Sequence, residues 1–249
     1  IQINHAQSLS ARDVFNKVVH SVVKVYAFDF WGIEFNMGSG VVIDKNTIVT
    51  NYHVFDGCEK LEVEHFGKRY NRMKILLAEP EIDILVLFVD DLNLEPIEIA
   101  DSSDLIIGEK IFAIGSPEGF ENTITDGIIS GIRQMNESIQ ISAGITHGSS
   151  GGAVVNENGK LIGISTMGLK ATNINLNFAI PASYLLNKSN WCNKEDLNCL
   201  KKTTSFCKAY NLTTSTEKIL KRISNYDYSI KLNSAIDNIR QALEIDPKQ

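Results

Sequence analysis

The stretch Gly148-Ser-Ser-Gly-Gly152 is the densest glycine cluster of the 249-residue chain, and it lies directly before the apolar run Ala153–Val155. Glycines on both sides of a serine allow a sharp backbone turn, expose the hydroxyl group and direct N–H groups into one concavity. Taken alone, this pattern favours an ordinary hairpin turn. Ser150 becomes a candidate nucleophile only if the fold brings a base and a carboxylate to it.

His53 and Asp83 are the candidates for the base and for the carboxylate that orients it. His53 follows the strand-like run Thr47–Thr50, where a strand ends and a loop begins, a place that suits a catalytic side chain. Asp83 comes directly before the apolar run Ile84–Phe88. A structural histidine and a strand-starting cap are the alternatives for these two residues. The chain order His, Asp, Ser is one of three known orders for a catalytic triad.

Short apolar runs rich in β-branched residues recur through the first part of the chain, separated by Gly, Asn and Asp. The runs are Ser21–Phe28, Gly40–Ile43, Thr47–Thr50, Ile84–Phe88, Ile111–Ile114, Gly127–Ile132, Ala153–Val155 and Leu161–Ile164. Many short strands at regular spacing predict an all-β barrel or sandwich. Residues 10–20 are expected to form a short helix capped by Ser10.

The composition changes just after Pro181. All 17 glycines lie at or before Gly168, so the last part of the chain has none. The segments Glu217–Ser224 and Ser229–Glu244 show helical spacing of apolar residues. We therefore expect a β-rich part over residues 1–185 and a helical extension over 186–249.

Charge and hydropathy exclude two classes of protein. The formal net charge is −6 and the pI is about 5.4, without a basic stripe, so a nucleic-acid partner is not expected. No stretch reaches the roughly 18 uninterrupted apolar residues that would span a bilayer, so the protein is not expected to be membrane-embedded. The chain begins at Ile1 rather than at a methionine, which indicates a removed leader or a trimmed chain.

Several segments, in order, resemble those of the HtrA/Deg-type serine proteases of the chymotrypsin superfamily. Ser39–Asp44 followed by Ile48–His53 is similar to their histidine segment, and Asp83–Leu87 to their aspartate segment. Further segments that resemble successive family motifs are Ile114–Gly119, Thr123–Ser130, Gly148–Ala153, Gly159–Ile164 and Asn177–Pro181. The resemblance covers about residues 10–185, and the shared order makes it far more specific than any single motif.

The resemblance implies a fold of two six-stranded antiparallel β-barrels, about residues 10–100 and 101–185, with the active site between them. It implies that His53 is the general base, Asp83 its orienting partner and Ser150 the nucleophile. No metal or organic cofactor is expected.

The resemblance also implies an oxyanion hole, a pair of donors that stabilises negative charge on the substrate oxygen. The backbone N–H groups of Gly148 and Ser150 would form it. The expected function is a serine endopeptidase that cleaves unfolded or extended polypeptides through an acyl-enzyme intermediate. Its expected location is periplasmic or secreted, inferred from the resemblance and the missing initiator methionine. The alternative is a catalytically silent protease fold that binds protein partners through its helical tail.

The specificity pocket is expected to have Gly144 at its floor, because in this superfamily the floor lies six residues before the nucleophile. The other pocket residues that the resemblance implies are Ile145, Ile164, Ser165, Thr166 and Phe178. With no carboxylate at the floor, a bound lysine or arginine would leave a buried unpaired charge. A small or apolar side chain before the cleaved bond is therefore predicted.

The chain also departs from the family pattern. Ser149 stands where digestive relatives have an aspartate that pairs with a freed N-terminus, so activation through Ile1 is not expected. The tail shows no PDZ domain, which many HtrA/Deg proteins carry.

The tail contains two weaker signals. Residues 216–249 have the 34-residue length of a tetratricopeptide repeat, although an ordinary amphipathic helix pair fits equally well. Either form is expected to dock on the barrels or to mediate self-association or partner binding. Two of the cysteines Cys192, Cys199 and Cys207 are candidates for a disulfide outside the cytoplasm, with free buried thiols as the alternative.

Overall fold

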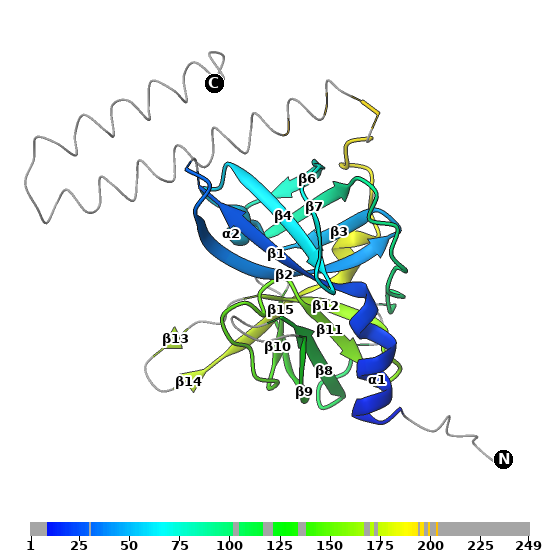
Figure 1. Ribbon diagram of the computed structural model, residues 1–249. Helices are drawn as coiled ribbons and strands as arrows, with labels where there is room; N and C mark the ends of the chain where they lie inside the picture. Colours follow the sequence, from blue (N-terminus) through cyan, green and yellow to red (C-terminus); the bar gives the residue numbers. More distant parts are fainter. Residues whose placement is uncertain are drawn as a thin grey trace, which may run out of the picture.

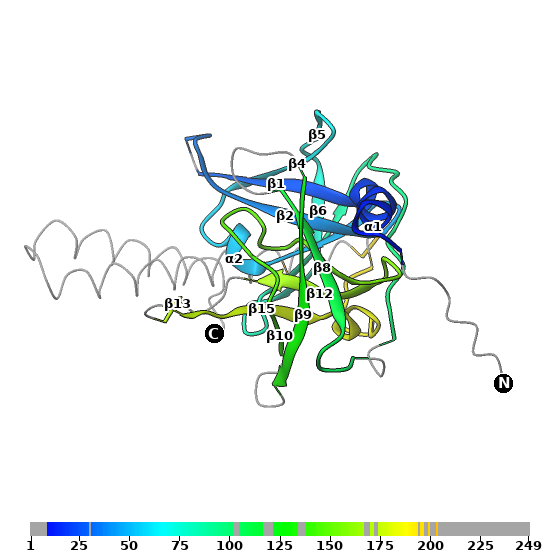
Figure 2. The same ribbon diagram turned by 90° about the horizontal axis from the view of Figure 1, so that it is seen from below.

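Two β-sheets, each built from one half of the strands in chain order, lie one above the other in the computed structural model of the protein (Figure 1). The structure describes residues 9–29, 31–101, 105–116, 122–133, 138–166, 170–171, 174–193, 195–196, 199 and 203. Figure 2 shows the same two-sheet arrangement after a 90° turn, with the first helix at one side of the sheets.

The first sheet has seven strands in the order β5-β4-β1-β2-β3-β7-β6. Their bounds are β1 Val22–Phe28, β2 Glu34–Asp44, β3 Thr47–Thr50, β4 Lys60–His65, β5 Lys68–Tyr70, β6 Met73–Glu79 and β7 Ile84–Val89. Neighbouring strands pair antiparallel, and β-branched side chains from β1, β2, β3 and β7 fill the core inside the sheet. The short helix α2, Tyr52–Phe55, follows β3 directly.

The second sheet is a closed barrel in the order β10-β15-β12-β11-β8-β9. Its strands are β8 Lys110–Gly115, β9 Thr123–Arg133, β10 Ser138–Ile141, β11 Ala153–Asn156, β12 Leu161–Thr166 and β15 Asn177–Pro181. A two-stranded pair, β13 Lys170–Ala171 and β14 Ile174–Asn175, lies outside the barrel. A short 3-10 helix, η3 Ala182–Leu185, follows β15.

The first helix, α1 Ala11–Val18, begins with a capping box in which the Ser10 side chain accepts from the Asp13 N–H and the Asp13 side chain accepts from the Ser10 N–H. The 3-10 turn η1, Val19–Ser21, leads from it into β1. Although α1 precedes the first sheet, Val14 and Val18 belong to a core that contains side chains of both sheets. The Lys17 ammonium also donates to the carbonyl of Asn158 at 2.7 Å, so α1 is tied to the second barrel.

The predicted fold class is confirmed: the protein is mostly β, with a closed six-stranded barrel and a second sheet. The first sheet differs in detail from the expected six-stranded barrel, because it has seven strands and its order ends at β5 and β6. The helix expected over residues 10–20 is α1 with η1. The eight predicted strand runs lie in strands, except that Ser21, the first residue of the run Ser21–Phe28, belongs to η1. The division into domains stays a prediction.

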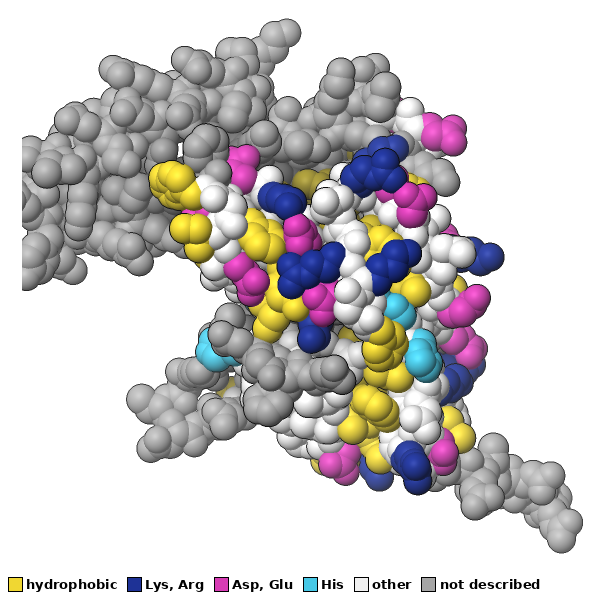
Figure 3. Space-filling view, in the orientation of Figure 1, with side chains coloured by type: hydrophobic (Ala, Val, Ile, Leu, Met, Phe, Trp, Pro, Cys, Tyr) yellow, Lys and Arg dark blue, Asp and Glu magenta, His cyan; other side chains and the backbone are white. Residues whose placement is uncertain are grey.

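Charged side chains are mixed on the face drawn in Figure 3, where basic and acidic groups lie beside one another over the first sheet. The Arg69 guanidinium donates to Glu62 and to Glu64, both at 2.9 Å. No helix among the described residues is long and apolar enough to cross a membrane.

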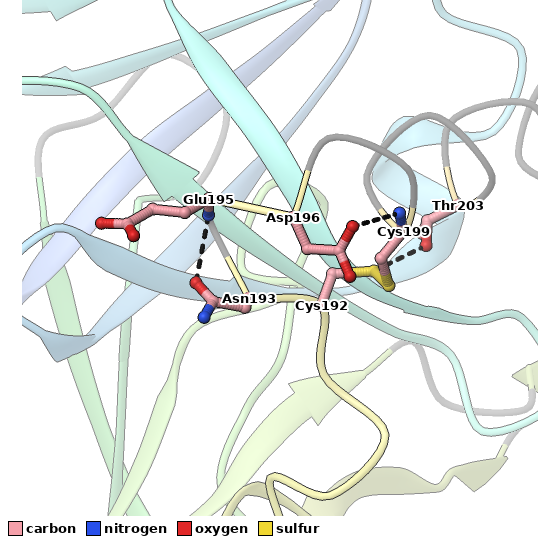
Figure 4. Close-up of a disulfide and its surroundings, with 6 residues drawn as sticks. All are labelled: Cys192, Asn193, Glu195, Asp196, Cys199 and Thr203. Carbon is pink, nitrogen blue, oxygen red and sulfur yellow. Dashed lines mark hydrogen bonds between the residues drawn. A yellow bond between two sulfur atoms is a disulfide. The ribbon is translucent and has the colours of Figure 1, made fainter.

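The chain after η3 returns to the first sheet. The Cys192 N–H donates to the carbonyl of Leu76 in β6 at 2.8 Å, and Cys192 is buried. Cys192 forms a disulfide with Cys199, drawn in Figure 4, so for this pair the structure selects the disulfide from the two alternatives that the sequence left open. The two predicted tail helices, the repeat-like segment 216–249 and Cys207 lie outside the described residues.

Candidate active site

The His53 and Asp83 side chains form a hydrogen-bonded pair. Strands β3 and β7 are neighbours, so α2 at the end of β3 lies beside the residue that precedes β7. His53 Nδ1 lies 2.8 Å from Asp83 Oδ2, and the His53 backbone N–H donates to Asp83 Oδ1 at 2.9 Å. Since a carboxylate can only accept, Nδ1 carries the hydrogen, and Nε2 of a neutral ring is left as an acceptor. This is the tautomer that a general base needs.

Asp83 is fixed from several directions. Its φ of 61° is uncommon for a residue with a side chain, and such backbone strain clusters at functional sites. Its carbonyl accepts from Asn51 Nδ2 at 3.1 Å and from the Tyr52 N–H at 3.2 Å. Oδ2 also accepts from the Thr166 hydroxyl at 2.8 Å. Thr166 ends β12 of the second barrel, so the carboxylate is held from both sheets.

Ser150 lies in the nucleophile loop, the name used here for residues 146–152, which precedes β11. Its carbonyl accepts from the Ser39 N–H of β2 at 2.7 Å, which places the loop against the first sheet. Gly151 has φ +84°, and a Cβ on it would lie 2.1 Å from the Ser39 carbonyl oxygen. A Cβ on Gly152 would lie 2.6 Å from the Ile114 carbonyl oxygen. Both glycines are therefore required by close approach of the backbone.

The turn at Gly148 is a type II turn. The Ser149 N–H donates to the Thr146 carbonyl at 3.0 Å, and Gly148, third in the turn, has φ +86°, while His147 is not among the residues of positive φ. Among the described residues, neither the Gly148 N–H nor the Ser150 N–H has a protein acceptor. Buried backbone donors are usually paired, so these two N–H groups remain the candidates for the expected oxyanion hole.

The two parts of the site meet through backbone contacts. The Thr50 hydroxyl donates to the Ser39 carbonyl at 2.7 Å, so Ser39, whose N–H bonds the Ser150 carbonyl, connects the nucleophile loop with the strand that leads into His53. The hydrogen bonds of these described residues join His53 to Asp83 but do not join the Ser150 hydroxyl to the His53 ring. Ser150 itself is only 6% exposed.

A cavity of about 100 Å³ lies behind the nucleophile loop. Three of the predicted pocket residues line it, Gly144, Ile145 and Ser165. The other lining residues are Ala113, Ile114, Gly115, Thr123, Thr125, Thr146 and Ser149, so the described lining contains no ionisable side chain. The structure places the other three predicted pocket residues differently. Ile164 is buried in the core between the sheets, Thr166 bonds Asp83, and Phe178 pairs with Thr166 across β12 and β15.

Sequence reasoning missed the roles of Ser39 and Asn51 and the bond from Thr166 to Asp83. Ser39 lies between Gly38 and Gly40, and a serine flanked by glycines is the same signal that drew attention to Ser150. Thr166 and Asn51 carried no local signal, because their partners are remote in the sequence or are backbone groups. Among the described residues, no group of three or more His, Cys, Asp or Glu side chains is arranged to hold a metal ion.

A family model described as a trypsin-like peptidase domain matches residues 38–164, which include His53, Asp83 and Ser150. The chain belongs to the trypsin-like peptidase family. The matched segment runs from β2 to β12, so this peptidase domain draws on both sheets.

Relatives of this trypsin-like peptidase are named as proteases. The periplasmic serine endoprotease DegP of Salmonella typhimurium is 39% identical over 163 residues, which are 61% of this chain and 34% of that protein. The chloroplastic Protease Do-like 1 of Arabidopsis thaliana is 37% identical over 154 residues, 57% of this chain and 35% of that protein. The chain thus spans about a third of the length of the curated relatives it matches.

A solved structure shows the same likeness. The serine endoprotease from Yersinia pestis matches with a TM-score of 0.65 and 32% identity, over 71% of this chain and 64% of that one. At this level of identity, the match covers sequence as well as fold.

Proposed function

We propose that this chain is a serine endopeptidase in which His53, Asp83 and Ser150 form the catalytic triad. The observation that carries the proposal is the pairing of His53 Nδ1 with Asp83 Oδ2, because it leaves Nε2 of the neutral ring free to accept a proton. The bond between Ser150 and His53 forms when substrate binds, since catalytic hydrogen bonds are often long or poorly aligned without substrate.

The reaction follows from these positions. The Ser150 Oγ attacks the carbonyl carbon of the peptide bond while His53 Nε2 takes its proton, and the carbonyl oxygen becomes an oxyanion. The N–H groups of Gly148 and Ser150 donate to that oxyanion. His53 then gives the proton to the leaving amine as the C–N bond breaks, which leaves an acyl-enzyme. Water then attacks the acyl carbon while His53 takes its proton, and His53 gives that proton to Ser150 Oγ as the bond between Oγ and the acyl carbon breaks, which releases the second product.

We propose unfolded or extended polypeptides as the substrates and an extracytoplasmic compartment as the location. The compartment is suggested by two relatives that are named periplasmic serine endoproteases. The Cys192–Cys199 disulfide supports the same compartment, because disulfides persist in oxidising environments and are rare in the cytosol.

Labelling with a fluorophosphonate probe tests the proposal. The Ser150 Oγ displaces fluoride from phosphorus, so the wild-type chain should gain a stable phosphonyl group on Ser150, located by peptide mass mapping. Ser150→Ala should not label, and Ser150→Ala or His53→Ala should lower casein turnover by roughly 10⁴–10⁶-fold. Heat-denatured wild type is the matched control for non-specific labelling. No labelling of folded wild type, together with no casein cleavage, would indicate the silent partner-binding scaffold instead.

A further inference from the structure

We propose that Ser39 is a positioning residue that holds the two oxyanion donors of the nucleophile loop in place. The inference rests on the proposed function, because it assigns Ser39 a role in the same reaction. Ser39 lies on β2 of the first sheet and is completely buried. It does not belong to the triad, and because it is buried it can affect the reaction only through the loop that it contacts.

Ser39 bonds the nucleophile loop at two places. Its backbone N–H donates to the Ser150 carbonyl at 2.7 Å, and its hydroxyl donates to the Gly148 carbonyl at 2.7 Å. These two carbonyls belong to the two residues whose N–H groups face the oxyanion. One residue of the first sheet therefore holds both donor residues of a loop that belongs to the second barrel.

The direction of the Ser39 hydroxyl is fixed by its other partner. The Ser116 N–H donates to Ser39 Oγ at 2.8 Å. Because that N–H supplies its own hydrogen, the single hydroxyl hydrogen of Ser39 is left for the Gly148 carbonyl. The Ser39 carbonyl is also engaged, since it accepts from the Thr50 hydroxyl. Each polar group of Ser39 thus has a partner, and Ser39 itself has little freedom to reorient.

The surroundings leave room for this arrangement only because they are glycines. A Cβ on Gly115 would lie 3.0 Å from Ser39 Oγ, and a Cβ on Gly38 would lie 3.0 Å from the Ser150 carbonyl oxygen. The backbone segments at Gly38, Gly115 and Ser150 therefore approach one another closely around Ser39, and a larger residue at either glycine would disturb this packing.

The hydrogen bonds from Ser39 to the two carbonyl groups also restrict the orientation of the peptide group that lies between them. The Ser150 N–H lies on the peptide that joins residues 149 and 150, between the anchored carbonyls of Gly148 and Ser150. The Ser165 hydroxyl bonds the Ser149 carbonyl of that same peptide at 2.6 Å. Gly148 has no side chain to restrict its backbone, so without the Ser39 hydroxyl its turn is freer to leave the type II form, which turns the Gly148 N–H away.

The test compares Ser39→Ala with Ser21→Ala. Ser21 is a matched control because it is also buried and its hydroxyl also donates to a carbonyl, that of Glu95 at 2.9 Å, outside the nucleophile loop. We expect Ser39→Ala to lower the second-order rate constant of fluorophosphonate labelling by about 10- to 100-fold, less than the loss of a whole oxyanion donor. Ser21→Ala should stay within about twofold of wild type.

Two further measurements separate positioning from folding. A peptide aldehyde with alanine at its reactive end forms an oxyanion on Ser150, so its affinity should fall in parallel with the labelling rate. The matching peptide amide, measured on Ser150→Ala with and without Ser39→Ala, should bind equally well. Ser39→Cys keeps a weak donor and should give an intermediate labelling rate, which serves as the test if Ser39→Ala does not fold.

The outcomes distinguish the two proposals. Equal labelling rates for folded Ser39→Ala and Ser21→Ala, or equal loss of aldehyde and amide affinity, would overturn the role of Ser39 while leaving the peptidase intact. If Ser39→Ala does not fold, a Ser39→Cys labelling rate equal to that of wild type would overturn it as well. Absence of labelling in wild type would overturn the proposed function, and the role of Ser39 with it.

Discussion

Thr166 on β12 donates its hydroxyl hydrogen to Asp83 Oδ2 at 2.8 Å, and the same oxygen faces His53 Nδ1. Thr166 belongs to the closed barrel, whereas His53 and Asp83 lie beside strands of the first sheet, His53 in α2 after β3 and Asp83 directly before β7. The orientation of the imidazole therefore depends on how the two sheets are held together.

Thr166→Val should lower kcat by about tenfold, because it removes this hydroxyl while keeping the shape of the side chain. Thr166→Ser keeps the hydroxyl and is the matched control, with a loss of less than about threefold. Casein turnover at saturating substrate measures both. Equal activity of the valine and serine variants would show that the bond has no part in catalysis.

Asp83→Asn should lower turnover by about 10⁴-fold, because an amide in this position favours the wrong histidine tautomer. Asp83 accepts from the His53 N–H, from the His53 ring and from Thr166, so an NH₂ group must point at one of these donors. Steady-state kinetics measure the loss, and circular dichroism checks that the variant folds. A loss below about tenfold in a folded variant would remove Asp83 from the triad.

Cleavage should occur after small or apolar residues rather than after lysine or arginine. The cavity behind the nucleophile loop has no ionisable group in its described lining, so a cationic side chain would lie there unpaired. Gly144→Asp supplies a carboxylate at a position where an added Cβ meets nothing closer than 4.0 Å. A peptide-library profile of this variant should shift toward lysine and arginine. A wild-type profile dominated by arginine would contradict the assignment of the pocket.

The segment just after η3 should contribute to stability, whereas residues beyond 203 should not be needed for labelling. Cys192 is buried against β6, and Trp191 packs on the core between the sheets. A chain ending at Leu186 should lose roughly 1–3 kcal/mol of unfolding free energy, because it lacks these side chains. A chain ending at Thr203 keeps these side chains and is the control, so it should be more stable than the chain ending at Leu186. Fluorophosphonate labelling lost in the 203-residue chain, with the barrels folded, would show that the tail completes the site.

Stability should decrease in mild acid because of His65. Burial lowers the pKa of His65 below its ordinary value, so the unfolded chain binds the proton more readily than the folded one. The contribution of this residue is complete above pH 6.5 and is lost as the pH falls through the lower pKa of the folded state. Urea unfolding at pH 7.5 and 5.0 should show a smaller decrease for His65→Gln than for wild type. The same decrease in both would assign the effect to other groups.

Local signals explain what the sequence could predict. The helix over residues 11–18 was predictable because its capping box lies within four consecutive residues. The buried strands were predictable because both faces carry β-branched side chains, as in β3 and β7. Strand β4 was missed because its lysine and glutamates alternate with apolar residues, which dilutes the apolar signal in a strand near the edge of the sheet.

Only the residues of the candidate site that lie in recognisable motifs could be predicted from the sequence. The resemblance brought His53, Asp83 and Ser150 together, and the structure adds the bond between the first two. The anchoring by Ser39 and Thr166 joins residues 109 and 83 positions apart, respectively, from their partners. Such contacts depend on how the two sheets pack, and no local pattern encodes that packing.

The place of α1 has a consequence for the order in which the molecule forms. This helix is the first described element to leave the ribosome, yet the apolar cluster to which it contributes Val14 and Val18 also contains Phe112, Val155 and Leu161, which are made much later. Until then Val14 and Val18 have only part of their partners. Contacts between such distant positions are slow to form, because the closure of a long loop costs entropy before the contact is made. We therefore expect the core around Val14 and Val18 to be complete only after the second barrel has formed, so that the two halves fold as one cooperative unit.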